Sequence, residues 1–587
     1  MDIYNKIGRR FLHSIERIRP LFNAGTGEGE CAMHFQDMPY RRITFEEMER
    51  RYRELIQDFQ AAPDAAACMD VLRRRDQLNA DSTPMELCYV RHDMDVNDPF
   101  YAAEQAYYDE IGPRIADLSS QLDALIVASP FRRELEEYAG SLALTMMEEG
   151  LRGSDSRLIP LATEENALLS RYNHLASNAA VQWEGRAVKR NLMTAWTQSQ
   201  DRETRRRAAL AVSASWEEQR GELEALYDQL VDNRNRQAKL LGLNSYVELS
   251  YHRMYRIGYG PEEVGLFRDQ VKRHLVPLLR ELDEKRRERL GLEHLYSYDC
   301  SVSFPDGNPV PLGDTAACLA ATREMYTRLS PETAQFIAYM LDNHLYDVEI
   351  RDGKRGGGYM MTFEKYRAPF IFANFDGTSE NAYIMCHEGG HAFQTWLKRD
   401  EDVRLRCGYT LEAAETHAMS MEFFTWPHME LFFGDRAEDY RRMHLERAVR
   451  LVARECLQDE FEQRIYEQPD MSPEARNQLW RRLEGEYVPC DDHSGNPNLE
   501  QGCGWQRIPH VFQWPFYAID YALAQVCALQ YCQWMHQDFS AAWQSYLGFC
   551  RSTGSLSFPK LVWEAGLKDP FAEDTLPDLV DWLRRFL

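Results

Sequence analysis

Apolar residues recur at spacings of three and four along most of the 587-residue chain, with few internal glycines or prolines. This spacing is typical of helices that bury one face. The clearest case is residues 201–242, which end at Gly242, a residue type that favours a helix C-terminus. The pattern therefore predicts a mainly α fold.

One region departs from the helical spacing. From residue 356 onward, two runs rich in aromatic and β-branched residues predict strands at 358–363 and 369–374, which would form a small sheet. A helix is predicted directly after them, with Ser379 as its N-cap. Much later, residues 489–509 form a long Gly/Pro/Asn-rich stretch, which predicts either a functional loop or a disordered surface excursion.

The domain prediction rests on a polar stretch around residues 195–205. It divides the chain into an N-terminal helical lobe, residues 1–200, and a second region, residues 201–587, which contains the small sheet. No internal repeat or low-complexity tract adds a further boundary.

Charge and composition narrow the possible partners. The chain has 68 basic and 93 acidic residues, a formal net charge of −25. Such a charge disfavours nucleic acid and anionic membrane as partners. The longest apolar stretches are shorter than the roughly 20 residues that a membrane helix needs, so we expect no membrane span.

Cysteine usage and the first residues predict a cytoplasmic protein. The 13 cysteines show no CxxC pairing, which favours reduced thiols. Arg9, Arg10, Glu16 and Arg17 interrupt the apolar residues of the N-terminal stretch, so the apolar core of a secretion signal is not expected there.

The sequence MCHEGGHAFQ, residues 385–394, carries the strongest chemical signal. On a helix, His387 and His391 lie one turn apart on the same face and can direct their imidazoles at one metal ion, typically zinc. Glu388 would lie beside that ion, where its carboxylate can move a proton. A histidine pair that falls on a helix by chance is the simpler alternative, so a third ligand is needed.

A histidine ligand at the next expected spacing is excluded, because that position holds Leu397. The amphipathic segment 410–424 instead offers three glutamates. Glu415 and Glu422 lie two turns apart on one face, whereas Glu412 is expected to point towards the rim. We therefore favour Glu415 as the third ligand and Glu422 as an acceptor for a ligand imidazole N–H.

Several separated motifs resemble the M3 family of zinc metallopeptidases, in particular the oligoendopeptidase F and Pz-peptidase branch. HEGGHAFQ and ETHAMSMEFF come in the family order, and the segments 233–256, 354–375 and 502–525 are also similar. The resemblance implies a helical two-lobed fold with a deep central channel, one Zn²⁺ per chain and oligopeptide substrates. By motif position it implies His387, His391 and Glu415 as zinc ligands and Glu388 as the general base.

Other residues are candidates for transition-state stabilisation or substrate binding. His510, Tyr517 and Tyr521 follow the long loop, and in related peptidases a downstream His and Tyr pair stabilises the transition state; the alternative for each tyrosine is a half-buried core aromatic. The strand APFIFANF, which contains Phe372, Ala373 and Asn374, would pair with an extended peptide if it formed an exposed edge. An ordinary buried hairpin is equally compatible with its sequence.

Two other functions stay open at this level. A zinc carboxypeptidase of similar helical fold would need a cationic pocket, for which Arg355, Arg367 and Arg507 are candidates. A catalytically inactive peptide-binding protein is the other alternative, and the presence of Glu388 argues against it. Cys386 points away from His387 on a helix, so we interpret it as a packed thiol rather than a ligand.

Overall fold

A computed structural model describes residues 33–177 and 179–587. The prediction about the N-terminal stretch falls mainly on residues 1–32, outside the described residues. Seven helices make up most of the N-terminal part: α2 (Phe45–Ala61), α3 (Ala65–Asp81), α4 (Thr83–Met94), α5 (Pro99–Val127), α6 (Arg132–Ala139), α7 (Ser141–Arg152) and α8 (Ile159–Ser177). They confirm the mainly α prediction for this part of the chain.

The following part begins with a hairpin that was not predicted, β1 (Ala180–Trp183) and β2 (Arg186–Lys189). Helices then resume with α9 (Thr194–Thr197), α10 (Arg202–Leu240), α11 (Tyr246–Arg253), α12 (Pro261–Gln270), α13 (Val276–Arg289), α14 (Thr315–Leu329) and α15 (Pro331–Asp342). The predicted helix over 201–242 is confirmed as α10. Its first turn is capped by the Asp201 carboxylate, which accepts a hydrogen bond of 2.8 Å from the Thr204 N–H.

A three-stranded sheet follows, in the order β3 (Tyr346–Glu349), β5 (Ala368–Phe375), β4 (Tyr359–Phe363). β4 and β5 confirm the two predicted strands, whereas β3 was not predicted. β5 pairs with β3 in parallel and with β4 in antiparallel orientation. It is therefore the central strand, and its backbone hydrogen bonds are already used.

The prediction of an exposed edge at Phe372, Ala373 and Asn374 is therefore wrong. Phe372 and Ala373 have 0% exposure. The Asn374 side-chain amide donates to the carbonyls of Arg355 and Gly357, at 2.9 and 2.8 Å. The physical reason is that a third strand, β3, covers the side of β5 that the two-strand prediction left open.

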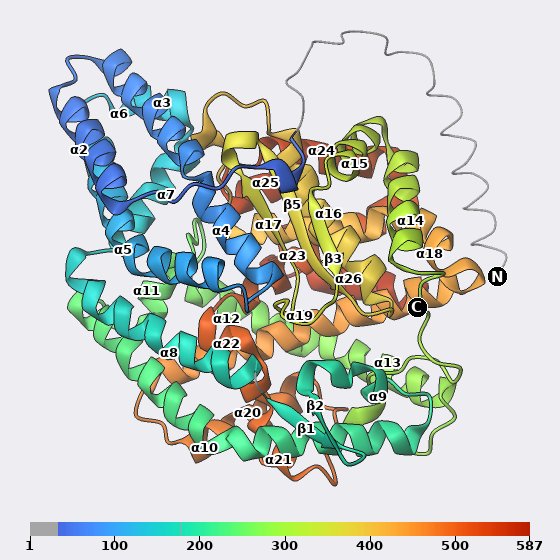
Figure 1. The fold of residues 1–587 in the computed structure, drawn as a ribbon. Coiled ribbons are helices and arrows are strands. Elements are labelled where there is room, and N and C mark those ends of the chain that lie inside the picture. The colour runs from blue at the N-terminus through green and yellow to red at the C-terminus, as the bar shows by residue number, and fades with distance from the viewer. Residues whose placement is uncertain (1–32, 178) are drawn as a thin grey trace.

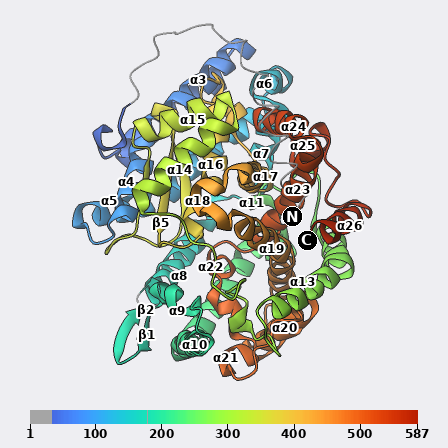
Figure 2. The same cartoon turned by 90° about the vertical axis from the view of Figure 1, so that its right-hand side faces the viewer.

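The last part of the chain is helical again: α16 (Glu380–Leu397), α17 (Leu411–Phe424), α18 (Glu430–Phe433), α19 (Ala437–Glu467), α20 (Pro473–Tyr487), α21 (Pro497–Glu500), α22 (Pro509–Gln513), α23 (Ala518–Gln537), α24 (Phe539–Ser552), α25 (Phe558–Glu564) and α26 (Thr575–Phe586). Figures 1 and 2 show α3 and α6 at one end of the molecule, α10, α20 and α21 at the other, and α16, α17 and α23 between them.

One local prediction needs correction, and for a second segment one of two alternatives is excluded. Ser379 precedes α16 as predicted, but its side chain makes no capping hydrogen bond; the Thr378 hydroxyl accepts one from the Glu380 N–H at 3.2 Å. The stretch 489–509 is an ordered segment rather than a disordered excursion, because it contains α21 and a 3₁₀ helix, Cys503–Arg507. Trp505 is buried there and donates to the Asn477 side chain at 2.7 Å.

The main hydrophobic core runs from Phe35 to Leu583 and draws on both predicted regions, and a second core from Ile43 to Met147 lies within the N-terminal helices. The boundary near residue 200, like the two lobes and the channel, stays a prediction. No helix among residues 33–177 and 179–587 is long and apolar enough to cross a membrane. The cysteines from Cys68 to Cys550 are all unpaired.

Candidate metal centre

The two histidines of α16 point their rings towards one space beside α17. His387 and His391 lie one turn apart, with ring centroids separated by 5.1 Å. The Nε2 atom of His387 is 3.5 Å from Glu415 Oε2, and the Nε2 atom of His391 is 3.8 Å from the same oxygen. Together the three residues offer ligand atoms that all lie within 4.8 Å of one another.

This donor set fits zinc. Donor atoms of a tetrahedral zinc site, with bonds of about 2.0–2.1 Å, lie roughly 3.3 Å apart, close to the separations seen here. Glu415 is only 3% exposed, and its Oε2 has no hydrogen-bond partner within the described part of the chain. A buried carboxylate oxygen without a partner is costly, and a cation between it and the two imidazoles would remove that cost.

A chain of hydrogen bonds orients the first histidine. His387 Nδ1 lies 2.7 Å from Glu422 Oε1, and His444 Nε2 lies 2.7 Å from Glu422 Oε2. The Trp426 indole N–H donates to His444 Nδ1 at 3.0 Å. Since that nitrogen accepts, Nε2 of a neutral His444 carries the proton and donates to Glu422. Glu422 can then accept the Nδ1–H of His387, which leaves the Nε2 lone pair free for a metal.

Two glycines allow α16 to approach its neighbours closely. A Cβ atom on Gly390 would lie 2.6 Å from Ala418 Cα and 2.7 Å from the His417 carbonyl oxygen, both on α17. A Cβ on Gly389 would lie 2.1 Å from the Tyr326 hydroxyl, which donates to the Met385 carbonyl at 3.1 Å. The helix therefore gives up favourable propensity at both positions: Gly390 lets α17, which carries Glu415, approach α16, and Gly389 makes room for Tyr326.

Glu388 follows His387 on α16 and is buried beside the donor set. Burial raises the pKa of Glu388 to about 7, against the opposing effect of His387. Burial also lowers the pKa of His391 to about 4, which favours the neutral imidazole that binds metal. A carboxyl group with a pKa near neutrality can both accept and release a proton.

The three downstream candidates lie together next to Glu415. The Tyr517 hydroxyl donates to Glu415 Oε1 at 2.7 Å. The ring centroid of His510 is 5.5 Å from that of Tyr517, and the centroid of Tyr521 is 4.8 Å from it. The structure thus groups the three side chains, with the Tyr517 hydroxyl in direct contact with the Glu415 carboxylate.

Glu412 was predicted to point towards the rim, and this prediction is wrong. Glu412 has 0% exposure and accepts from the Tyr259 hydroxyl at 3.2 Å. The physical reason is that α17 has no solvent-facing side between Glu412 and Phe424, where every residue is buried.

The arginines considered for a carboxylate pocket have separate partners. Arg355 binds Asp93 at 3.0 Å, Arg367 donates to the Arg399 carbonyl at 3.0 Å, and Arg507 donates to Ser213 and Asn498, each at 2.9 Å. They give no shared cationic pocket. Cys386 is buried with its Sγ 3.3 Å from the Thr425 hydroxyl, and it does not belong to the candidate metal-binding group.

Three residues near the candidate metal centre, Tyr383, His444 and Trp426, were not predicted from the sequence. Tyr383 stacks on the His387 ring at a centroid distance of 5.7 Å, and the position of Tyr383 one turn earlier on α16 would have been a usable signal. His444 carried no such signal, because it lies on α19 and reaches Glu422 only through tertiary packing. Trp426 follows α17 directly, and its contact is with His444, so it carried no signal either.

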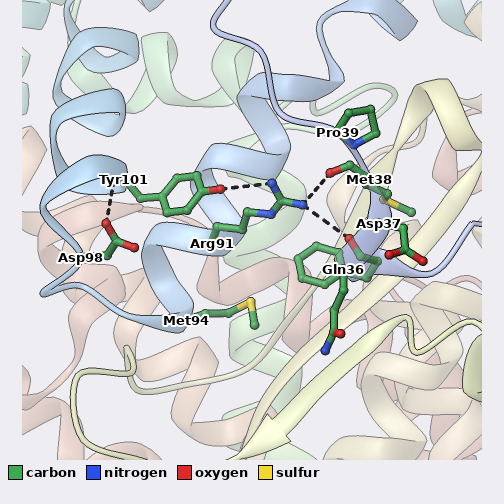
Figure 3. A pocket seen from close by; sticks show the side chains of 9 residues that line it. Gln36, Asp37, Met38, Pro39, Arg91, Met94, Asp98 and Tyr101 are labelled. Carbon is green, nitrogen blue, oxygen red and sulfur yellow. Dashed lines mark hydrogen bonds between the residues drawn. The ribbon is translucent and has the colours of Figure 1, made fainter.

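A hollow of about 520 Å³ lies elsewhere in the molecule (Figure 3). Residues 35–39, Arg91, Met94, Asp98 and Tyr101 line it. Arg91 donates to the Met38 carbonyl at 2.7 Å and contacts the Tyr101 hydroxyl at 3.1 Å, so its guanidinium is used to hold the segment 35–39 in place. No residue of the candidate metal centre lines this hollow.

Comparison with known families agrees with the fold. The profile described as Peptidase family M3 matches residues 195–304 and 335–580, and the Peptidase M3 N-terminal domain matches residues 35–153. The chain belongs to peptidase family M3.

Within that family it belongs to the oligoendopeptidase F and Pz-peptidase branch. A solved structure of PZ peptidase A with an inhibitor is 38% identical, covering 94% of this chain and 99% of that one, with a TM-score of 0.90. A candidate oligoendopeptidase F from Bacillus anthracis is 36% identical over 94% of this chain and 98% of that one, with a TM-score of 0.87. The chromosomal oligoendopeptidase F of Lactococcus lactis subsp. cremoris is 24% identical, and the match spans 60% of each chain.

Proposed function

We propose that the chain is a zinc-dependent endopeptidase that hydrolyses internal bonds of short peptides. The observation that carries this proposal is the convergence of His387, His391 and the unpaired oxygen of buried Glu415 on one space, next to Glu388. The names of its relatives, oligoendopeptidase F and Pz peptidase, support the reaction class. The implied deep channel would admit peptides and exclude folded proteins.

His387, His391 and Glu415 would hold the zinc ion, and Glu422 would keep the His387 ring in place. When bound, zinc supplies Lewis-acid chemistry, which acidifies water and polarises a carbonyl group. Glu388 accepts a proton from the attacking water at its carboxylate and later gives that proton to the leaving amine. Its raised pKa, near 7, suits a group that must do both.

Peptide hydrolysis develops negative charge on the carbonyl oxygen, and hydrogen-bond donors beyond the metal would stabilise it. Tyr517 is the first candidate donor, because its hydroxyl already lies beside the ligand Glu415. Tyr521 and His510 pack against the Tyr517 ring and are the next candidates.

The test uses two internally quenched peptides of the same sequence, one with both ends blocked and one with free ends. An endopeptidase cleaves both, and the products map to an internal bond by mass spectrometry. A carboxypeptidase would cleave only the peptide with a free C-terminus. Failure of a zinc-loaded chain to cleave either peptide would favour the inactive peptide-binding alternative.

A further inference from the structure

The turn between α22 and α23 contains a strained residue. Phe516 has φ of +71°, in the left-handed region that residues other than glycine rarely adopt. Its ring is buried and packs near Tyr246 and Tyr466, with centroids 6.5 and 5.8 Å away. Strain of this kind persists only where the surroundings fix the backbone, and it is often found next to functional groups.

Two buried charged side chains fix the backbone of Phe516. The Phe516 N–H donates to Glu462 Oε2 at 2.5 Å. The Arg256 guanidinium donates to the Phe516 carbonyl and also lies 3.4 Å from the Asp520 carboxylate on α23. The N–H and the carbonyl of Phe516 are therefore held by Glu462 on α19 and by Arg256 in the loop that follows α11.

Two further side chains hold the residues just before Phe516. The Arg234 guanidinium on α10 donates to the Phe512 carbonyl at 2.5 Å. The Ser250 hydroxyl on α11 donates to the Pro515 carbonyl at 3.3 Å. The turn 512–516 is thus attached through its backbone to α10, α11 and α19, rather than by side-chain packing alone.

The position of this turn determines where Tyr517 lies. Tyr517 is the next residue after Phe516 and directly precedes α23, so its Cα–Cβ direction follows from the backbone of the turn. Its N–H donates to the Trp514 carbonyl at 3.1 Å, and its hydroxyl donates to Glu415 at 2.7 Å. A small rotation at Phe516 would move the hydroxyl away from the candidate metal centre.

We propose that Glu462 and Arg256 are positioning residues for Tyr517, which act by holding the left-handed turn at Phe516. The inference rests on the proposed function, in which Tyr517 donates to the developing oxyanion. Neither residue touches the candidate metal ligands through a hydrogen bond. They would act through the backbone of Phe516.

Glu462 allows a test because two replacements differ in whether they can accept a hydrogen bond from the Phe516 N–H. Glu462→Leu removes the acceptor for the Phe516 N–H, whereas Glu462→Gln keeps an oxygen acceptor of the same shape. Burial raises the pKa of Glu462 to about 8, so the neutral amide of Gln is a close replacement. Glu446→Leu is the matched control, because Glu446 is also buried on α19 but pairs with Arg286 and Arg289 and not with the turn.

We expect Glu462→Leu to lower kcat about 100-fold, the effect of a displacement of about 1 Å at a catalytic group, while zinc content stays unchanged. KM should change by less than about threefold, because the donor acts in the transition state. Glu462→Gln should recover kcat to within about fivefold of the wild type. Glu446→Leu should lower the melting temperature and leave kcat unchanged.

A double-mutant cycle separates positioning from general destabilisation. If Glu462 acts through Tyr517, the Glu462→Leu/Tyr517→Phe variant should be no slower than Tyr517→Phe alone, within about threefold. Multiplicative losses, or a normal kcat in folded Glu462→Leu protein, would overturn the inference. Should Glu462→Leu fail to fold, Ser250→Ala takes its place, with an expected loss of about three- to tenfold and the same lack of additivity.

The same variants distinguish this inference from the proposed function. If kcat is low in Tyr517→Phe but normal in Glu462→Leu, only the positioning role is refuted. Normal turnover of Tyr517→Phe refutes the donor role of Tyr517 and the inference with it, while cleavage by the wild-type chain would still support an endopeptidase.

Discussion

The close contact between α16 and α17 leads to a prediction for Gly390→Ala. The added Cβ would lie 2.6 Å from Ala418 Cα, whereas ordinary contacts begin at 3.4 Å, so α17 must retreat by about 3.4 − 2.6 = 0.8 Å. Glu415 lies on the same helix, and its distances to the two imidazoles, 3.5 and 3.8 Å, would increase. The substitution therefore acts on the metal site without changing any ligand.

The expected effect on stability is small compared with the effect on the site. Ala gains about 1 kcal/mol over Gly in helix propensity, and overpacking costs about 1–3 kcal/mol, so the net destabilisation is roughly 0–2 kcal/mol. Zinc affinity should fall at least about tenfold. This is the lower end of the loss of metal affinity seen when a residue that hydrogen-bonds to a metal ligand is removed. Turnover should fall about 100-fold for a displacement near 1 Å.

Competition with a fluorescent zinc chelator measures the affinity, and hydrolysis of a quenched peptide at saturating zinc measures turnover. Gly221→Ala on α10 is the control, because its Cβ would have no neighbour within 4 Å, and it should raise stability without affecting zinc. Wild-type zinc affinity and turnover in folded Gly390→Ala protein would refute the claim that this glycine sets the position of Glu415.

Three other variants test separate parts of the account. Glu388→Gln should keep its zinc and lose about 10²–10⁴-fold in kcat, and near-normal hydrolysis would contradict its role as the base. His444→Leu should weaken zinc binding about 10- to 100-fold by freeing Glu422, which a chelator titration would show. Burial alone would raise the pKa of Glu446, but Arg289 and Arg286 lower this pKa below 4.5. The ionised carboxylate therefore stabilises the fold above pH 4.5, and this stabilisation is lost as the pH falls through the lower, folded-state pKa. Glu446→Gln should therefore have a lower melting temperature than the wild type at pH 7, and the difference in melting temperature should shrink below pH 4.5. A difference in melting temperature that does not depend on pH would contradict this.

The parts of the fold that depend on local pattern could be predicted from the sequence. The spacing of apolar residues predicted α10 and α17, and the four-residue spacing of His387 and His391 predicted their convergence. The β1–β2 hairpin also has a local sequence signal, Gly185 in the two-residue segment Glu184–Gly185 between the strands. In the structure both residues have positive φ, as a two-residue hairpin turn of this kind requires.

The parts that depend on tertiary packing could not be predicted. β3 has four residues and is defined by its parallel pairing with β5, which no local pattern encodes. The burial of Glu412 follows from neighbours on every side of α17, so the sequence of that helix alone suggested a rim. The role of Gly390 is visible only once Ala418 is placed opposite it.

The central claim is that Glu415, together with the two histidines, binds one zinc ion. Equilibrium zinc binding to the wild type, Glu415→Gln and Glu412→Gln tests it most directly, because the two glutamates lie one turn apart on the same buried helix. We predict one zinc per wild-type chain, similar affinity in Glu412→Gln, and a loss of at least about 100-fold in Glu415→Gln. Unchanged affinity in Glu415→Gln, or a comparable loss in Glu412→Gln alone, would contradict the account.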